Sequence, residues 1–171
     1  MVPILYLAHG ASGNAASMAP HVAALRQRGV TAHAVQLPKG RAEAAVATYQ
    51  AAAPPDAAVA IGGHSFGGRV ASLLAAEQHY AALVLLSYPL HAPGAQERWD
   101  ERTAHWPRIG CPVLLLSGDR DPFARIELLR DAVRRLPDAE LVVYPGLRHG
   151  IGPVMEEAMD RVVAFLKATT G

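Results

Sequence analysis

The sequence predicts an α/β protein in which a six-stranded parallel sheet lies between two layers of helices. Six short runs are almost continuously apolar, which is typical of strands that are covered on both faces. Segments with helical spacing separate these runs, and such alternation with right-handed crossovers gives a doubly wound sheet with the strand order 2-1-3-4-5-6. The apolar runs are 3–8, 30–35, 57–62, 82–87, 112–117 and 140–144.

Helices are predicted between the strands and after the last one. Pro20 stands near the start of the first helix and Gly29 follows its end, as is common at helix termini. Pro54 ends the second helix, and Pro122 is expected at the first position of the fourth. The predicted helices span 17–28, 41–53, 66–78, 122–135 and 153–167, and a weaker candidate lies within 96–105.

Length and composition indicate one globular domain over residues 1–171, with 51% hydrophobic and 18% charged residues. The net charge of +1, without a run of Lys or Arg, argues against nucleic acid and anionic membrane surfaces as partners. The first apolar run is too short to span a bilayer, and no basic region precedes it as in a signal peptide. The single cysteine, Cys111, excludes an internal disulfide and fits a reducing, cytoplasmic location.

A G-x-S-x-G motif at 63–67 follows the third apolar run and opens the third helix. A serine at the tip of a sharp strand-to-helix turn requires neighbours with almost no side chain, and Gly63, Gly67 and Gly68 meet this requirement. The alternative is a phosphate-binding loop, but no Lys-Ser or Lys-Thr pair follows and the GxGxxG spacing is absent. The motif therefore predicts a nucleophile elbow that carries Ser65.

A serine hydroxyl becomes a good nucleophile when a histidine, itself held by a carboxylate, takes its proton. The loop after the fifth strand carries Asp119 and Asp121, and the loop after the sixth carries His149. Carboxyl ends of parallel strands share one edge, so His149 is the predicted general base. Asp121 could instead cap the following helix, whereas Asp119 lies closer to its strand, and the residues alone leave both acids open.

Two backbone N–H groups are predicted to hold the oxyanion that forms during attack on a carbonyl. Phe66 N–H follows the nucleophile directly, and Gly10 would let the loop after the first strand bring Ala11 N–H close. His9 and His64 lack the i, i+4 spacing of a helical metal-ligand pair, so we interpret them as residues that shape the loops. No metal or cofactor is expected.

These features resemble the α/β-hydrolase superfamily over essentially the whole chain. The sequence is similar in particular to a small branch, the KANL3/Tex30-like hydrolases, which is related to dienelactone hydrolases. The resemblance implies Ser65 as the nucleophile, Asp121 as the acid and His149 as the base. The stretches that carry it are 9–11, 63–69, 87–94, 111–118 and 121–123, of which 87–94 is the most specific for the branch.

Larger members of this superfamily insert a lid where this chain has room for little more than one short helix. We therefore expect an open crevice shaped by Tyr88, Leu90 and His91, with Trp99 and Trp106 either lining it or packing beneath it. An open crevice favours small esters or thioesters over long-chain lipids. The predicted function is a lidless serine hydrolase of the carboxylesterase type. The alternatives are a thioesterase or lactonase at the same site, or an interaction protein that keeps the fold without turnover.

Overall fold

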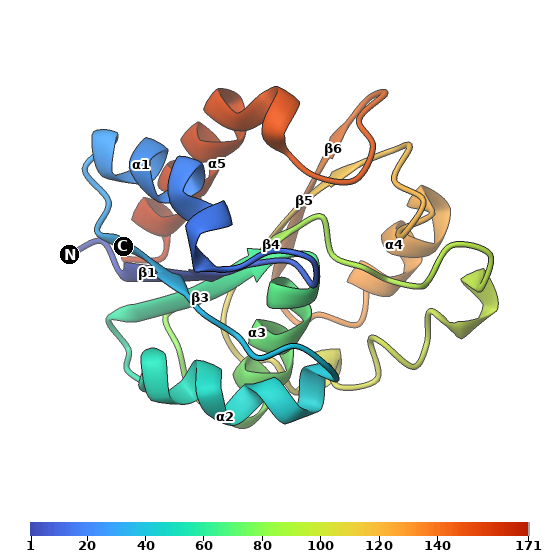
Figure 1. Ribbon diagram of the computed structural model, residues 1–171, viewed down its shortest axis with the longest axis horizontal. Coiled ribbons are helices and arrows are strands. Elements are labelled where there is room, and N and C mark those ends of the chain that lie inside the picture. The colour runs from blue at the N-terminus through green and yellow to red at the C-terminus, as the bar shows by residue number, and fades with distance from the viewer. Residues whose placement is uncertain (171) are drawn as a thin grey trace.

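The computed structural model describes residues 1–170 and contains a six-stranded parallel sheet in the order β2-β1-β3-β4-β5-β6 (Figure 1). All five strand pairs are parallel, so the predicted sheet and its strand order are confirmed. The strands are β1 (Ile4–Ala8), β2 (Ala32–Val35), β3 (Val59–His64), β4 (Ala82–Leu86), β5 (Val113–Gly118) and β6 (Ala139–Tyr144).

Helices cover both faces of the sheet (Figure 1). On one face α1 packs beside α5, and on the other α2 packs beside α3, with α4 further along the same face. The helices are α1 (Ala19–Gln27), α2 (Ala42–Ala52), α3 (Phe66–Glu77), α4 (Ile126–Val133) and α5 (Met155–Ala168). Short 3-10 turns are η1 (Ala15–Met18), η2 (Gln96–Arg98), η3 (Trp106–Arg108) and η4 (Gly152–Val154).

Alternate side chains of each central strand enter two separate cores, because successive residues of a strand point to opposite faces. Leu83 and Leu85 of β4 lie in the core under α2, α3 and α4. Val84 and Leu86 of the same strand lie in the core under α1 and α5. This two-sided burial explains why the strands are hydrophobic without alternation.

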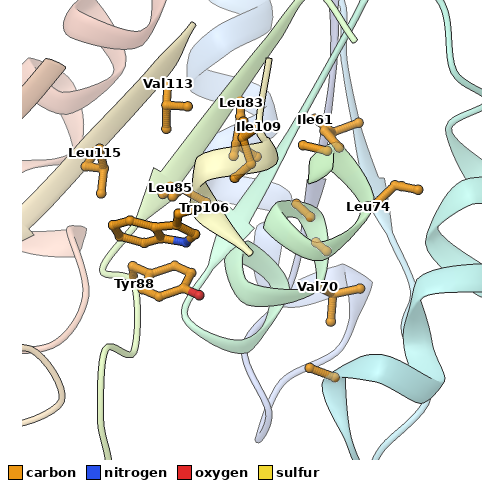
Figure 2. Close-up of a cluster of buried hydrophobic side chains, with 14 of the residues drawn as sticks. Ile61, Val70, Leu74, Leu83, Leu85, Tyr88, Trp106, Ile109, Val113 and Leu115 are labelled. Atoms are coloured by element: carbon orange, nitrogen blue, oxygen red, sulfur yellow. The ribbon is translucent and has the colours of Figure 1, made fainter. Parts of the chain in front are cut away.

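Two aromatic side chains extend the core under α2, α3 and α4, here called the α3 core, beyond the end of β4 (Figure 2). Tyr88 and Trp106 are almost fully buried, and their ring centroids lie 5.0 Å apart in an edge-to-face arrangement. Trp106, which the sequence left open between lining and packing, therefore packs.

None of the helices within residues 1–170 is long and apolar enough to cross a membrane.

Two helix predictions are wrong. The weaker candidate within 96–105 is the 3-10 turn η2 followed by successive turns, whose backbone bonds join residues three apart, as from Trp99 N–H to Gln96 O. The fourth helix starts at Ile126 instead of Pro122. Before it, the Asp121 carboxylate accepts the Phe123 N–H at 2.8 Å, and this contact holds a separate turn.

Candidate active site

Ser65 lies at the tip of the turn between β3 and α3, in a conformation that few L residues adopt. Its φ is 49° and its ψ is −117°, a conformation that costs on the order of 1–3 kcal/mol. The turn stays tight because Ser65 N–H donates to Leu86 O at 2.9 Å, while Ser65 O accepts Arg69 N–H at 3.1 Å in the first turn of α3. A Cβ on Gly63 would lie 2.6 Å from the backbone carbon of Gly67 in α3, so β3 and α3 can approach this closely only with glycine there.

The three side chains predicted to act together form one chain of hydrogen bonds. His149 Nε2 lies 2.9 Å from Ser65 Oγ, and His149 Nδ1 lies 2.8 Å from Asp121 Oδ2. The ionised carboxylate can only accept, so Nδ1–H donates to Asp121 and Nε2 is left to accept the serine proton. The Asp121 side chain is fully buried and that of His149 is 22% exposed, so the imidazole can reach substrate.

Asp119, the competing acid, lies elsewhere. Its Oδ1 accepts the Gly146 N–H at 2.7 Å and so braces the turn after β6. The side chain of Asp119 is exposed and makes no hydrogen bond to His149. The residue order alone left both acids open, and of the two only Asp121 is hydrogen-bonded to His149.

The two predicted oxyanion donors border the same hollow as Ser65. Phe66 is the first residue of α3, where a helix leaves its N–H groups without an internal partner. Among the described residues, neither Phe66 N–H nor Ala11 N–H has a hydrogen-bond acceptor. Both donors are therefore free to meet an oxygen of a bound molecule.

His9 and His64 adjoin the two loops that carry these donors: His9 directly follows β1, and His64 is the last residue of β3. His9 is buried, and its Nε2 accepts the Leu37 N–H at 3.0 Å, so its Nδ1–H donates to Gly10 O at 2.7 Å. This side chain ties the loop after β1 to the end of β2. Burial, and next the nearby His149, lower the pKa of His64 to about 4, so His64 stays neutral near pH 7. Within residues 1–170 no group of three His, Cys, Asp or Glu side chains is placed to hold a metal.

A hollow of about 390 Å³ opens beside Ser65. The pocket residues predicted from the sequence do not line it. Tyr88 and Leu90 are buried in the α3 core, and His91 borders a neighbouring hollow. The residues that line the first hollow are Ala11, Gly40, Arg41, Ala42, Glu43, Ser65, Phe66, Arg69, Pro89, Arg102 and Phe123.

A family model described as "Alpha/beta hydrolase domain" matches residues 37–161. The chain belongs to the α/β-hydrolase family. The match includes the elbow, both acidic candidates and the histidine of the hydrogen-bonded chain. No curated protein matches the sequence at a significant level.

Solved structures share the fold of this α/β-hydrolase. A monoacylglycerol lipase from Paleococcus ferrophilus is 17% identical with a TM-score of 0.80, over 96% of this chain and 94% of that one. An esterase from Pyrococcus furiosus is 19% identical with a TM-score of 0.78, over 98% and 81%. Est1E from Butyrivibrio proteoclasticus, solved with ferulic acid bound, is 18% identical with a TM-score of 0.77, over 98% and 89%. At these identities the likeness shows the fold alone.

Two further residues hold the site of this α/β-hydrolase together, and sequence reasoning missed both roles. The side-chain Nε2 of His91 accepts the Arg125 N–H at 3.0 Å, and the backbone N–H of His91 donates to Phe123 O at 3.0 Å. These two bonds fix the loop after β4 to the loop that carries Asp121. Ser87 has a φ of 51° and is fully buried. Its Oγ accepts the N–H of Gly150, the residue after the histidine, at 3.1 Å.

Proposed function

We propose that the chain is a serine hydrolase that cleaves small carboxylic esters through an acyl-enzyme. Ser65 is the nucleophile, His149 the general base and Asp121 the carboxylate that fixes the imidazole. The observation that carries the proposal is the pair of hydrogen bonds, 2.9 Å and 2.8 Å long, that link these side chains in the order the chemistry needs.

In the first half-reaction Ser65 Oγ bonds to the ester carbonyl carbon while its proton passes to His149 Nε2. The carbonyl π electrons move to oxygen, and the N–H groups of Phe66 and Ala11 stabilise the resulting oxyanion, each donor by about 3–4 kcal/mol. Collapse breaks the bond to the leaving alkoxide, which takes the proton from His149. Water then repeats the sequence on the acyl-enzyme and releases the acid.

The surroundings of Ser65 support a small substrate. Between β4 and β5 the chain forms only the short turns η2 and η3, and the hollow of about 390 Å³ is open to solvent. Thioesters and lactones undergo the same acyl transfer, so both belong in the substrate panel beside esters.

Active-site labelling tests this proposal. A fluorophosphonate probe should label the wild type and 4-nitrophenyl acetate should be hydrolysed, whereas Ser65→Ala should lose both reactions. Ser12→Ala is the matched control, because Ser12 is an exposed serine in the neighbouring loop after β1. Labelling that persists in Ser65→Ala would contradict the proposal. No turnover on the panel, together with a partner recovered by pulldown, would favour the interaction protein.

We also propose that the chain is a single domain of the KANL3/Tex30-like branch and works in a reducing compartment, the cytoplasm. The branch rests on the sequence of 87–94, and the compartment rests on the lone Cys111. That thiol is buried, and burial raises its pKa to about 11, so it is suited to packing and not to nucleophilic attack.

A further inference from the structure

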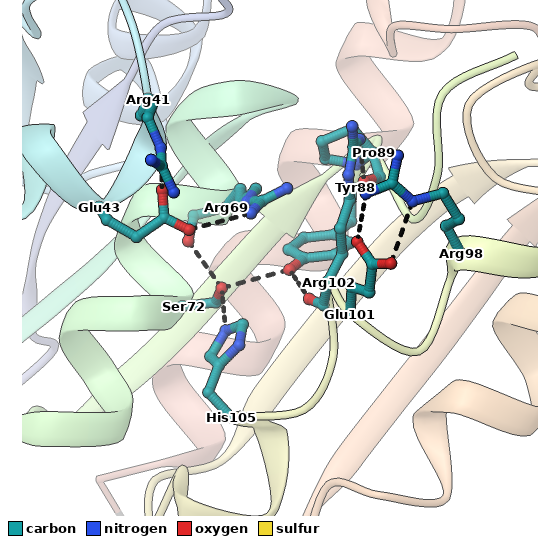
Figure 3. Close-up of polar contacts among 10 residues, drawn as sticks. All are labelled: Arg41, Glu43, Arg69, Ser72, Tyr88, Pro89, Arg98, Glu101, Arg102 and His105. Atoms are coloured by element: carbon teal, nitrogen blue, oxygen red, sulfur yellow. Dashed lines mark hydrogen bonds and ion pairs between the residues drawn. The ribbon is translucent and has the colours of Figure 1, made fainter. Parts of the chain in front are cut away.

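The charged side chains around the hollow are mostly arginines (Figure 3). Arg41, Arg69 and Arg102 border it together with Ser65, and Glu43 is the one acidic side chain on its wall. Three guanidinium groups against one carboxylate leave two positive charges beside the proposed nucleophile. The overall net charge of the chain is only +1, so this balance is a local feature.

Glu43 neutralises only part of this charge. Its Oε1 lies 3.3 Å from Arg69 Nη2, and its Oε2 lies 3.8 Å from Arg41 Nε. A hydrogen bond from its own backbone N–H, and then the charges of Arg69 and Arg41, lower the pKa of Glu43, so it carries its full negative charge. Arg102 makes no ion pair among the described residues.

Arg69 and Arg102 are held in place and only partly satisfied. The Arg69 side chain is 21% exposed, and its Nε is buried without a hydrogen-bond partner among residues 1–170. Arg102 Nη1 donates to Pro89 O at 2.9 Å, which fixes the guanidinium at the edge of the hollow. Burial, and next the charge of Arg69, lower the pKa of Arg102, because the two cations repel each other. Such a pair is stabilised by an anion that both can bind.

We propose that Arg69 and Arg102 form an anion subsite, with Arg41 at its rim, and that the ester cleaved at Ser65 carries a carboxylate or phosphate group. This inference rests on the proposed function. Guanidinium groups bind carboxylates and phosphates through two parallel N–H bonds. Arg69 lies in the first turn of α3, which begins directly after Ser65, and both side chains border the same hollow. The anionic group is therefore separated from the scissile carbonyl by a spacer of a few bonds.

Matched ester pairs test the subsite. On the acyl side the pair is mono-4-nitrophenyl adipate and neutral 4-nitrophenyl hexanoate. On the alcohol side it is 4-acetoxybenzoate and neutral 4-acetoxybenzamide, with 4-acetoxyphenyl phosphate as the phosphate probe. We expect kcat/KM for the anionic member of at least one pair to exceed that of its neutral partner by about ten- to a hundredfold. The preferred anion identifies carboxylate or phosphate as the physiological group.

The arginine variants should change the ratio of anionic to neutral kcat/KM. Arg102→Gln and Arg69→Gln should lower the ratio to near one, while Arg102→Lys should keep part of it because the charge remains. Arg108→Gln is the matched control, since Arg108 is an exposed arginine that pairs with Glu77 at the far end of α3. If a buried-site variant fails to fold, Arg41→Gln, an 86% exposed position, should still lower the ratio.

Two results would overturn the inference. The first is Ser65-dependent cleavage of the neutral esters at least as fast as the anionic ones, which leaves the esterase proposal intact. If no ester is cleaved, the esterase proposal fails and the subsite is tested separately by calorimetry. Binding of 4-hydroxybenzoate to Ser65→Ala that Arg102→Gln removes would then support the subsite. The second overturning result is calorimetry in which Ser65→Ala binds neither 4-hydroxybenzoate nor inorganic phosphate.

Discussion

Replacing Asp121 with asparagine should abolish most turnover without unfolding the protein. Asparagine has nearly the same shape, and its Oδ1 can still accept the Phe123 N–H, which lies 2.8 Å from the present carboxylate oxygen. That bond directs the new NH₂ group toward His149 Nδ1, where Asp121 Oδ2 now lies at 2.8 Å. Because an NH₂ group can only donate, the imidazole must place its proton on Nε2.

An imidazole protonated on Nε2 cannot accept the Ser65 proton at 2.9 Å. In a triad of this kind the wrong tautomer lowers kcat about 10⁴-fold. This factor corresponds to about 5.5 kcal/mol in the activation barrier. We expect kcat for 4-nitrophenyl acetate to fall by this order in Asp121→Asn, with a melting temperature close to that of the wild type.

Asp119→Asn is the matched control, because it makes the same chemical change two residues earlier. Asp119 contacts the Gly146 N–H at 2.7 Å, and asparagine keeps an oxygen for that bond. Its kcat should stay within about threefold of the wild type, measured in the same stopped-flow or plate assay. A large loss only in Asp119→Asn, or full activity in Asp121→Asn, would refute the assignment of the acid.

Three further predictions concern the framework. Ser87→Ala removes the acceptor that holds the histidine loop, and should lower kcat about tenfold and the free energy of unfolding by about 1 kcal/mol. Ser117→Ala, which removes a buried hydroxyl without a partner in the described chain, should change neither, and equal effects would contradict this role for Ser87. Gly63→Ala should reduce the free energy of unfolding in urea by about 1–3 kcal/mol through backbone overlap, whereas Gly110→Ala, with open space around its Cβ, should not. Burial, and next the charge of Arg69, lower the pKa of His105 from 6.5 to about 4. As the pH falls from 6.5 to 4, the unfolded chain protonates His105 before the folded chain does, so His105 lowers the free energy of unfolding by about 3 kcal/mol. His64, whose pKa is also lowered to about 4, adds a loss of its own. His105→Gln should remove its own part of this dependence and leave that of His64, and an unchanged pH profile would exclude a contribution from His105.

The sheet could be predicted because burial on both faces leaves a simple trace in the sequence. Every residue of β4 is buried, so its sequence is a continuous apolar run. The segment between β4 and β5 has no continuous apolar run of this kind. Its path depends on contacts distant in sequence, such as Trp106 in the α3 core and the bond from Arg135 to Thr103 at 3.0 Å. Local helical propensity cannot report these contacts.

Part of the candidate site could be predicted, because local backbone geometry and sheet topology also constrain the sequence. Ser65 is surrounded by glycines that local geometry requires, and topology brings the loop of His149 to the same edge. Arg69 could also have been predicted, because it lies one helical turn after Ser65. Arg102 could not, since it comes from a segment without regular structure. The predicted lining residue Tyr88 instead points into the core, where its OH lies near Ser72.

The two serines with positive φ explain how the imidazole stays aligned without a lid. Ser65 and Ser87 follow β3 and β4, which are neighbours in the sheet, and both hydroxyls contact the loop of His149 and Gly150. One contacts the imidazole and the other contacts the next backbone amide. Asp121, from the end of β5, holds the other ring nitrogen. Three adjacent strand ends therefore hold the imidazole, and the strained backbone of Ser87 is the conformation in which its Oγ meets the Gly150 N–H.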